Sequence, residues 1–199
     1  MPEISLTSFV DFVLASGTTR IRRVREIKRQ IEEGYSPATD FCKGIRERIV
    51  ECHREGSDLA LLDRVVAQAH ERKRLHYQEI AGGYRQFLKG KSVESFDPPW
   101  GEWSYGDLRV TINPELGLDV GGVPHVVKLY FKADPVSRRR VQVVLHLMQD
   151  ALGRSVRKKQ VGVLDIRRAK LHSAKALPSD LGALLAGEAA AFIEMWRRV

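Results

Sequence analysis

The chain has 199 residues, of which 43% are hydrophobic and 29% charged, and these globular proportions argue against intrinsic disorder. Its apolar stretches fall far short of the roughly 20 residues of a membrane span, and residues 8–15 contain Asp11 and follow no basic start, unlike a signal peptide. The net charge of +8 favours polyanionic partners such as DNA or RNA without being specific for them. We therefore expect a cytoplasmic protein with no membrane association.

The first half of the chain is patterned for helices. A Ser36-Pro37 pair has the form of an N-cap followed by proline at the first helical position, and Ser57 is placed to cap a further helix. The sequence Ala-Gly-Gly at 81–83 is expected to end that last helix, with a short helix around 84–88 after it. The predicted helices are 5–16, 18–33, 36–55 and 57–80.

Residues 92–107 differ in composition from what precedes them. Two prolines, two glycines and two tryptophans in this short stretch indicate a structured connection rather than a flexible linker. We expect Trp100 and Trp103 to pack over a core, the alternative being platforms on which bases stack. The chain thus divides into a helical region (1–91), a Pro/Trp-rich connection (92–107) and a mixed α/β domain (108–199).

The second half alternates strands and helices. A strand is predicted at 108–113, a hairpin at 113–134, a helix from Asp134-Pro135 to Gly153, a strand at 161–166 and a closing helix from Ser179 or Asp180 to Trp196. The expected fold class is therefore α+β, with an N-terminal helical segment followed by a mixed β-sheet flanked by helices.

The hairpin brings acids and lysines together. If Gly121-Gly122 is a two-residue turn, residues whose numbers sum to 243 lie opposite one another, and Glu115 faces Lys128. Pro124 near the turn can lengthen the loop and shift this register by two, which preserves the faces. One face is then apolar, and the other carries Glu115, Asp119, Lys128, Tyr130 and Lys132. An ordinary hairpin with one buried and one solvated face, carrying a cross-strand ion pair, has the same alternation.

The order of these features resembles the core of the PD-(D/E)XK, or restriction-endonuclease-like, nuclease superfamily over residues 105–170. The features are a strand with an acid, a hairpin, a lysine-bearing strand, a helix with Gln142 and the strand at 161–166. The resemblance implies metal-dependent hydrolysis of phosphodiesters, with Asp119 and Glu115 holding Mg²⁺ or Mn²⁺. It also implies Lys128 or Lys132 as the catalytic lysine and Gln142 as a supporting residue.

The second acid of that motif is missing in both possible frames. With Asp119 and Lys132 as the acid and the lysine, Tyr130 stands where the second acid belongs. With Pro114-Glu115 and Lys128, Val126 occupies that place. A single strand acid binds Mg²⁺ poorly unless Asp134, Asp107 or an acid of the helical half joins it. His125 and His146 are further candidates for a general base, against a packed or surface role.

Two basic segments are candidates for phosphate contacts. Residues 150–175 hold eight Lys and Arg against two Asp, and the alternative is a solvated loop with a polar strand end. Residues 17–30 carry six Lys and Arg, and an amphipathic surface helix explains them equally well. The candidate nucleic-acid-binding residues are Arg154, Arg157, Lys158, Lys159, Arg167, Arg168 and Lys170.

The leading hypothesis is a nucleic-acid-binding protein with a degenerate nuclease-like core that, if catalytic, hydrolyses phosphodiesters with a divalent metal. The alternative is a non-catalytic interaction or scaffold module with a protein partner or a homo-oligomeric state. Cys42 and Cys52 are ten residues apart in one predicted helix, about 15 Å along its axis, so they are expected to be two separate thiols. No spacing typical of a structural zinc site occurs in the sequence.

Overall fold

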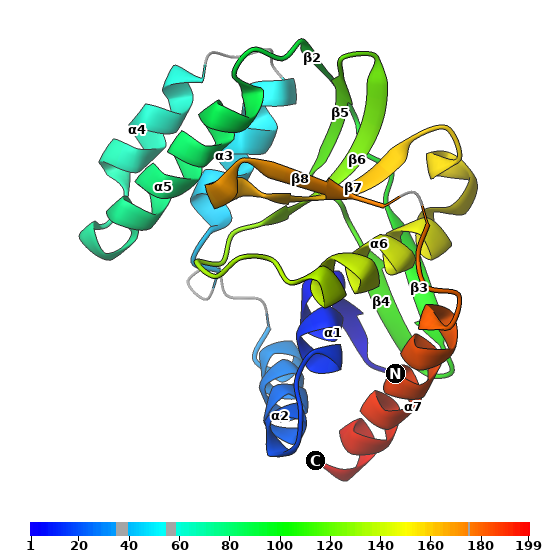
Figure 1. Ribbon diagram of the computed structural model, residues 1–199. Helices are drawn as coiled ribbons and strands as arrows, with labels where there is room; N and C mark the ends of the chain where they lie inside the picture. The colour runs from blue at the N-terminus through cyan, green and yellow to red at the C-terminus, as the bar shows by residue number, and fades with distance from the viewer. Residues whose placement is uncertain (35–39, 55–58, 175) are drawn as a thin grey trace.

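The computed structural model of the protein describes residues 1–34, 40–54, 59–174 and 176–199. Its fold class is α+β, as predicted, with mixed sheets flanked by helices (Figure 1). The helices are α1 (Leu6–Val13), α2 (Thr18–Glu32), α3 (Lys43–Arg54), α4 (Ala60–Gln68), α5 (Glu71–Leu88), α6 (Arg138–Leu152) and α7 (Leu181–Arg198), with 3-10 turns η2 (Gly153–Val156) and η3 (Ile166–Arg168). The strands are β1 (Glu3–Ser5), β2 (Val93–Phe96), β3 (Gly101–Tyr105), β4 (Leu108–Ile112), β5 (Leu116–Val120), β6 (Val123–Tyr130), β7 (Gln160–Asp165) and β8 (Lys170–Ser173).

The strands form two sheets. The larger one has the order β2-β5-β6-β7-β8, in which β6 and β7 run parallel and all other neighbours run antiparallel. The smaller one has the order β1-β4-β3, with β1 parallel to β4. The parallel step from β6 to β7 is bridged by α6, because a parallel connection needs a crossover of a dozen or more residues.

The predicted hairpin register is confirmed. Leu116 pairs with Val127 and Val120 with Val123, so paired numbers sum to 243 and Pro124 does not shift the strands. Both turn glycines have positive φ, 62° at Gly121 and 84° at Gly122, which a two-residue turn of this kind requires.

The expectation of a hairpin with one solvated face is wrong, because helices cover both faces of the larger sheet. Val127 and Leu129 pack in a cluster with residues of α3, α4 and α5. Val126 points to the other side and packs in a second cluster with residues of α6, as do Val161 and Val163 of β7. Figure 1 shows α3–α5 and α6 on opposite sides of this sheet.

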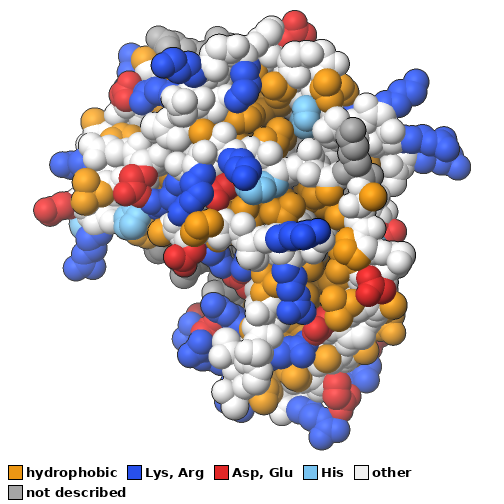
Figure 2. All heavy atoms as spheres, viewed as in Figure 1, with side chains coloured by type: hydrophobic (Ala, Val, Ile, Leu, Met, Phe, Trp, Pro, Cys, Tyr) orange, Lys and Arg blue, Asp and Glu red, His pale blue; other side chains and the backbone are white. Residues whose placement is uncertain are grey.

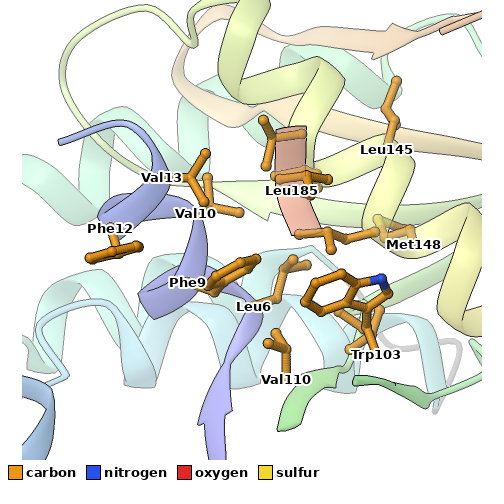
Figure 3. Packing of buried hydrophobic residues seen from close by; sticks show 14 of the residues in the cluster. Leu6, Phe9, Val10, Phe12, Val13, Trp103, Val110, Leu145, Met148 and Leu185 are labelled. Carbon is orange, nitrogen blue, oxygen red and sulfur yellow. The ribbon is translucent and has the colours of Figure 1, made fainter. Parts of the chain in front are cut away.

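The N-terminal segment packs with the C-terminal half of the chain. Phe9 of α1 stacks on Trp103 of β3 at 5.5 Å between ring centroids, and Phe12 meets Phe192 of α7 edge to face at 5.0 Å. Figure 3 shows α1 contributing to a cluster with Trp103, Leu145 and Leu185. The region predicted as 1–91 therefore contributes to two clusters, with α1 and α2 in one and α3–α5 in the other.

Several local predictions need correction. The helix expected at 5–16 is preceded by a strand and begins only at Leu6, because the Ser5 hydroxyl caps it by accepting a hydrogen bond from the Ser8 amide at 3.1 Å. The segment 92–107, predicted as a structured connection, contains the strands β2 and β3, which were not predicted. The helix after the hairpin starts at Arg138 rather than at Asp134-Pro135, because the Ser137 hydroxyl caps it.

The helical half also differs from its prediction. Helix α5 runs through Gly82 and Gly83 to Leu88, so the predicted break at 81–83 is wrong. The chain instead interrupts the helix at 69–70, between α4 and α5. The predicted caps Ser36-Pro37 and Ser57 lie outside the described residues, whereas residues 40–42 are described and are not helical.

The two cysteines are free, as predicted, although Cys42 lies in the turn before α3 rather than in the helix with Cys52. Burial raises the pKa of the Cys42 thiol, so that thiol stays protonated near neutral pH. No helix in the described parts of the chain combines the length and the apolar character that crossing a membrane requires.

Candidate functional site

Glu115 and Lys128 form the centre of the hairpin's polar side. The ammonium of Lys128 on β6 lies 2.6 Å from Oε1 of Glu115, which directly precedes β5, and it also donates to the Asn113 carbonyl at 3.1 Å. The second oxygen of Glu115 accepts the Leu129 amide at 2.8 Å. Each of the two charged side chains is only 12% exposed, so the expected cross-strand pair is present and largely buried.

Asp119, the other predicted metal ligand, lies at the far end of the same strand. Its Oδ1 accepts the Gly122 amide at 2.7 Å, which closes the hairpin turn. Three residues of extended chain lie between it and Glu115, so the two Cα atoms are about 13 Å apart. The two carboxylates therefore cannot ligate one cation, since Mg²⁺ ligands lie about 2 Å from the ion.

Lys132 forms an ion pair with Asp11, an acid that the sequence hypothesis did not name as a site residue. Asp11 of α1 accepts two hydrogen bonds from Lys132 Nζ, at 2.9 and 3.0 Å, and one from Arg140 Nη2 of α6 at 2.6 Å. The Arg140 guanidinium also lies 5.8 Å from the Tyr130 ring centroid. Burial raises the pKa of the Asp11 carboxyl, but the hydrogen bonds and charges of Lys132 and Arg140 outweigh this effect and leave the pKa below its usual value.

Replacing Asp11 by asparagine is expected to cost about 2 kcal/mol of stability at pH 7, because two cations lose their charge-assisted hydrogen bonds. A carboxyl with a lowered folded-state pKa stabilises the fold above its unfolded pKa of about 3.9 and loses that contribution as the pH falls through the folded value. The difference between wild type and Asp11→Asn should therefore shrink below about pH 4. Urea unfolding at pH 7 and at pH 3 measures it.

The exposed Glu94 on β2 offers the matched control. Glu94→Gln removes one carboxylate from the surface and should stay within about 0.5 kcal/mol of wild type at pH 7. A cost for Asp11→Asn that is the same at both pH values would contradict the assigned role of Asp11.

Val126 and Tyr130 occupy the two positions where the nuclease motif would place its second acid, and both pack against the protein interior. Val126 is fully buried in the cluster under α6, and Tyr130 is half-buried. Burial is the main cause that raises the pKa of Tyr130, so its hydroxyl stays neutral at physiological pH. Within the described ranges, no group of three or more His, Cys, Asp or Glu side chains is placed to hold a metal ion. The residues present do not fit the metal site that the nuclease resemblance implies.

The pairs Glu115–Lys128 and Asp11–Arg140 line one large cleft of about 1900 Å³. Its walls come from β1, α1 and the end of α2 on one side, from α3 on another, and from β5, β6 and the segment 95–98. Six lining residues are acidic and five are basic, so the cleft carries almost no net charge. The acids are Glu3, Asp11, Glu33, Asp40, Asp97 and Glu115, and the bases are Arg46, Arg54, Lys128, Lys132 and Arg140.

Gln142 and the two histidines lie away from this cleft. Arg140 and Val144 face the cleft from α6, and Gln142, two residues from each, points to the opposite side of the helix. His146 approaches the start of α7, where a Cβ on Gly182 would lie 3.4 Å from its Nε2. His125 is buried, and its Nδ1 lies 2.7 Å from the Val123 carbonyl.

The candidate nucleic-acid-binding residues fall into two groups. Arg154, Arg157, Lys158 and Lys170 are exposed, and none has an ion-pair partner among the described residues. The others make internal contacts, among them Lys159 with the Ser155 carbonyl at 2.9 Å.

Both arginines of η3 are held in place by the fold. Arg167 forms an ion pair with Glu79 of α5 and donates to the Phe131 carbonyl at 3.0 Å, and its side chain is only 11% exposed. Arg168 pairs with the buried Asp165 and donates to the Ala133 carbonyl at 2.7 Å. The side chains of Arg167 and Arg168 thus hold η3 to neighbouring segments through ion pairs and hydrogen bonds.

Three of the six cations at 17–30 make contacts within the protein, whereas Arg22, Arg25 and Arg29 are exposed. Arg20 of α2 pairs with Glu188 of α7, and its guanidinium lies 4.3 Å from the Phe12 ring centroid. Arg23 pairs with Glu26 at 2.9 Å, and Lys28 donates to the Val199 carbonyl. These contacts favour the amphipathic-helix interpretation of this segment over the phosphate-binding one.

Comparison of the chain with protein families, with curated proteins and with solved structures finds no match.

Proposed function

We propose that this protein binds nucleic acid through exposed cations at the two ends of α6, on a core that resembles the PD-(D/E)XK superfamily and does not hydrolyse its ligand. The observation that carries the proposal is the distribution of cations that the fold leaves without acidic partners. Arg154, Arg157 and Lys158 follow the end of α6, and Arg138 and Arg139 begin it. All five are exposed, and no ion pair engages them in the described part of the chain.

The side of α6 turned away from the cleft lies between these two groups of cations, and it is partly covered where His146 approaches the start of α7. Gln142, His146 and Gln149 recur at helical spacing and lie on the side turned away from the cleft. Fifteen helical residues place the two groups about 22 Å apart, a span that several successive phosphates of one strand can follow. Figure 2 shows this side of the molecule, with Lys and Arg side chains over the α6 region and projecting beyond it on the right.

The cleft itself is a weaker candidate for binding a polyanion. Four of its five cations, all but Arg54, pair with nearby acids, and the lining as a whole offers phosphates no surplus of positive charge. The adjacent strands β5, β6 and β7, with α6 connecting the last two, support the nuclease-like core. Val126 and Tyr130 at the second acid's positions argue against hydrolysis.

Binding is tested by fluorescence anisotropy with labelled single-stranded DNA, single-stranded RNA and duplex DNA between 50 and 300 mM salt. The triple variant Arg154→Ser/Arg157→Ser/Lys158→Ser should bind at least about tenfold more weakly at 50 mM salt, with a salt slope reduced by about 2 to 3, because each phosphate contact contributes roughly 0.7 to 0.9 to that slope. The control Arg64→Ser/Arg72→Ser/Lys89→Ser removes the same charge from exposed positions in the helical half. Equal losses in both variants, or no binding by wild type, would refute the proposal.

A plasmid cleavage assay tests whether the protein hydrolyses the nucleic acid that it binds. Wild type with Mg²⁺ or Mn²⁺ should nick supercoiled plasmid no faster than buffer alone. Cleavage by wild type that the double variant Glu115→Gln/Lys128→Met abolishes and Asp119→Ala retains would assign the reaction to the Glu115–Lys128 pair instead.

A further inference from the structure

Trp100 is far more exposed to solvent than the neighbouring aromatic residues. Its side chain is 79% exposed, the highest value for a large apolar residue in the described chain, whereas Trp103 is 8% exposed. Trp103 is packed as predicted, and its indole Nε1 donates to Asp150 at 2.9 Å. The prediction that Trp100 also packs over a core is wrong, and its indole ring is left facing solvent.

The loop that carries Trp100 is anchored at both ends on the segment that carries the unpaired cations. At one end, Lys159 Nζ lies 5.8 Å from the Phe96 ring centroid. At the other end, Gly101 packs so closely on the last turn of α6 that an added Cβ would lie 2.9 Å from the Ala151 carbonyl oxygen. Arg154, Arg157 and Lys158 all lie in the segment between these two anchor points, Ala151 and Lys159.

The chemistry of this surface fits an unpaired nucleotide. An exposed indole offers a flat π-face on which any base can stack, and the guanidinium and ammonium groups of the segment that contacts both ends of the loop can bind the phosphates on either side of that base. Pro98 and Pro99 have fixed φ angles, so the loop loses little conformational freedom when the ring becomes ordered. In a duplex the faces of the bases are already stacked on one another, so the indole can stack only on an unstacked base.

We propose that Trp100 and the segment 151–159 form a binding site for single-stranded nucleic acid, in which one base stacks on the indole ring and Arg154, Arg157 and Lys158 contact the backbone. This inference rests on the proposed function and gives it a ligand class. It predicts that the protein prefers single strands over duplexes of the same length.

The test compares the affinity of wild type and Trp100→Ala for a labelled 20-nucleotide oligo(dT) and for a 20-base-pair duplex. Loss of the stacking platform should weaken oligo(dT) binding roughly 5- to 100-fold. Duplex binding should change less than about twofold, because it depends on the cations. Trp100→Phe, which keeps an aromatic face, should retain most of the affinity for oligo(dT). Leu75→Ala truncates an equally exposed apolar side chain on α5, 73% exposed, and should have no effect.

Intrinsic fluorescence gives an independent readout. Oligo(dT) should quench the tryptophan emission of wild type, and Trp100→Phe should remove most of that quenching although Trp103 and Trp196 remain. If Trp100→Ala binds oligo(dT) as wild type does while the triple cation variant binds weakly, the stacking site is refuted and the proposed function stands. Equal weakening of oligo(dT) and duplex by Trp100→Ala also refutes stacking. If wild type binds neither ligand, both proposals fail.

Discussion

Replacing Gly83 by alanine is expected to destabilise the protein by about 3 kcal/mol or more, at the upper end of the cost of overpacking. Helix α5 passes so close to η3 at this point that a Cβ on Gly83 would overlap the Ile166 carbonyl oxygen and lie 3.0 Å from the Arg167 Cα. Both contacts are with backbone atoms, which cannot rotate away as a flexible side chain can. The substitution must therefore push α5 away from the edge of the sheet.

Gly82 provides the control on the same helix. A Cβ at Gly82 would meet nothing within 4 Å, so Gly82→Ala should raise the stability by up to about 1 kcal/mol through helix propensity alone. Urea unfolding followed by circular dichroism measures both variants. If both substitutions change the free energy of unfolding by the same amount in the same direction, α5 does not pack on η3 through Gly83.

The second large effect is expected at the Glu115–Lys128 pair. Removing one partner leaves an uncompensated charge that is largely buried, so Glu115→Gln and Lys128→Met should each cost about 3 to 5 kcal/mol. The double variant Glu115→Gln/Lys128→Met should cost much less than the sum, because the introduced glutamine would still present an oxygen to the Leu129 amide and no charge would remain unpaired.

A double-mutant cycle in urea at pH 7 measures the coupling, which should exceed about 2 kcal/mol. Asp119→Asn serves as the control, because asparagine can still accept the Gly122 amide in the turn and should cost less than about 1 kcal/mol. If the stability losses of the two single variants sum to the loss of the double variant, water screens the pair. The cleft would then be more polar than the burial of these side chains indicates.

Local patterns predicted the hairpin well because its register depends on neighbouring residues. Two glycines fix the turn, and the alternation of side chains follows from it. The burial of the polar face escaped prediction, since the partners that cover it come from distant segments. Asp11 is the clearest case, because nothing within residues 8–15 indicates that its partners are Lys132 and Arg140.

The prediction of a helix break at Gly82-Gly83 failed for a related reason. The pair Gly82-Gly83 has the composition of a helix break, yet α5 continues through it and the missing Cβ of Gly83 allows a close approach to η3. The sequence also did not show that Trp100 is exposed, because the exposure of a tryptophan depends on what the rest of the chain packs against it. The pairing of Glu115 with Lys128 could thus be predicted from the hairpin, while the burial of this pair depended on contacts from distant segments.

The pairing of β1 with β4 has a consequence for how the chain acquires its structure during synthesis. Glu3–Ser5 lie beside Arg109–Thr111, so the first strand leaves the ribosome more than one hundred residues before its neighbour exists. Until then the apolar side chains of α1, including Phe9 and Phe12, can pack only on α2 and lack their partners from β3, β4, α6 and α7. The nascent N-terminal segment therefore waits for distant parts of the chain before it can be fully buried, and it is the part that a chaperone would find exposed.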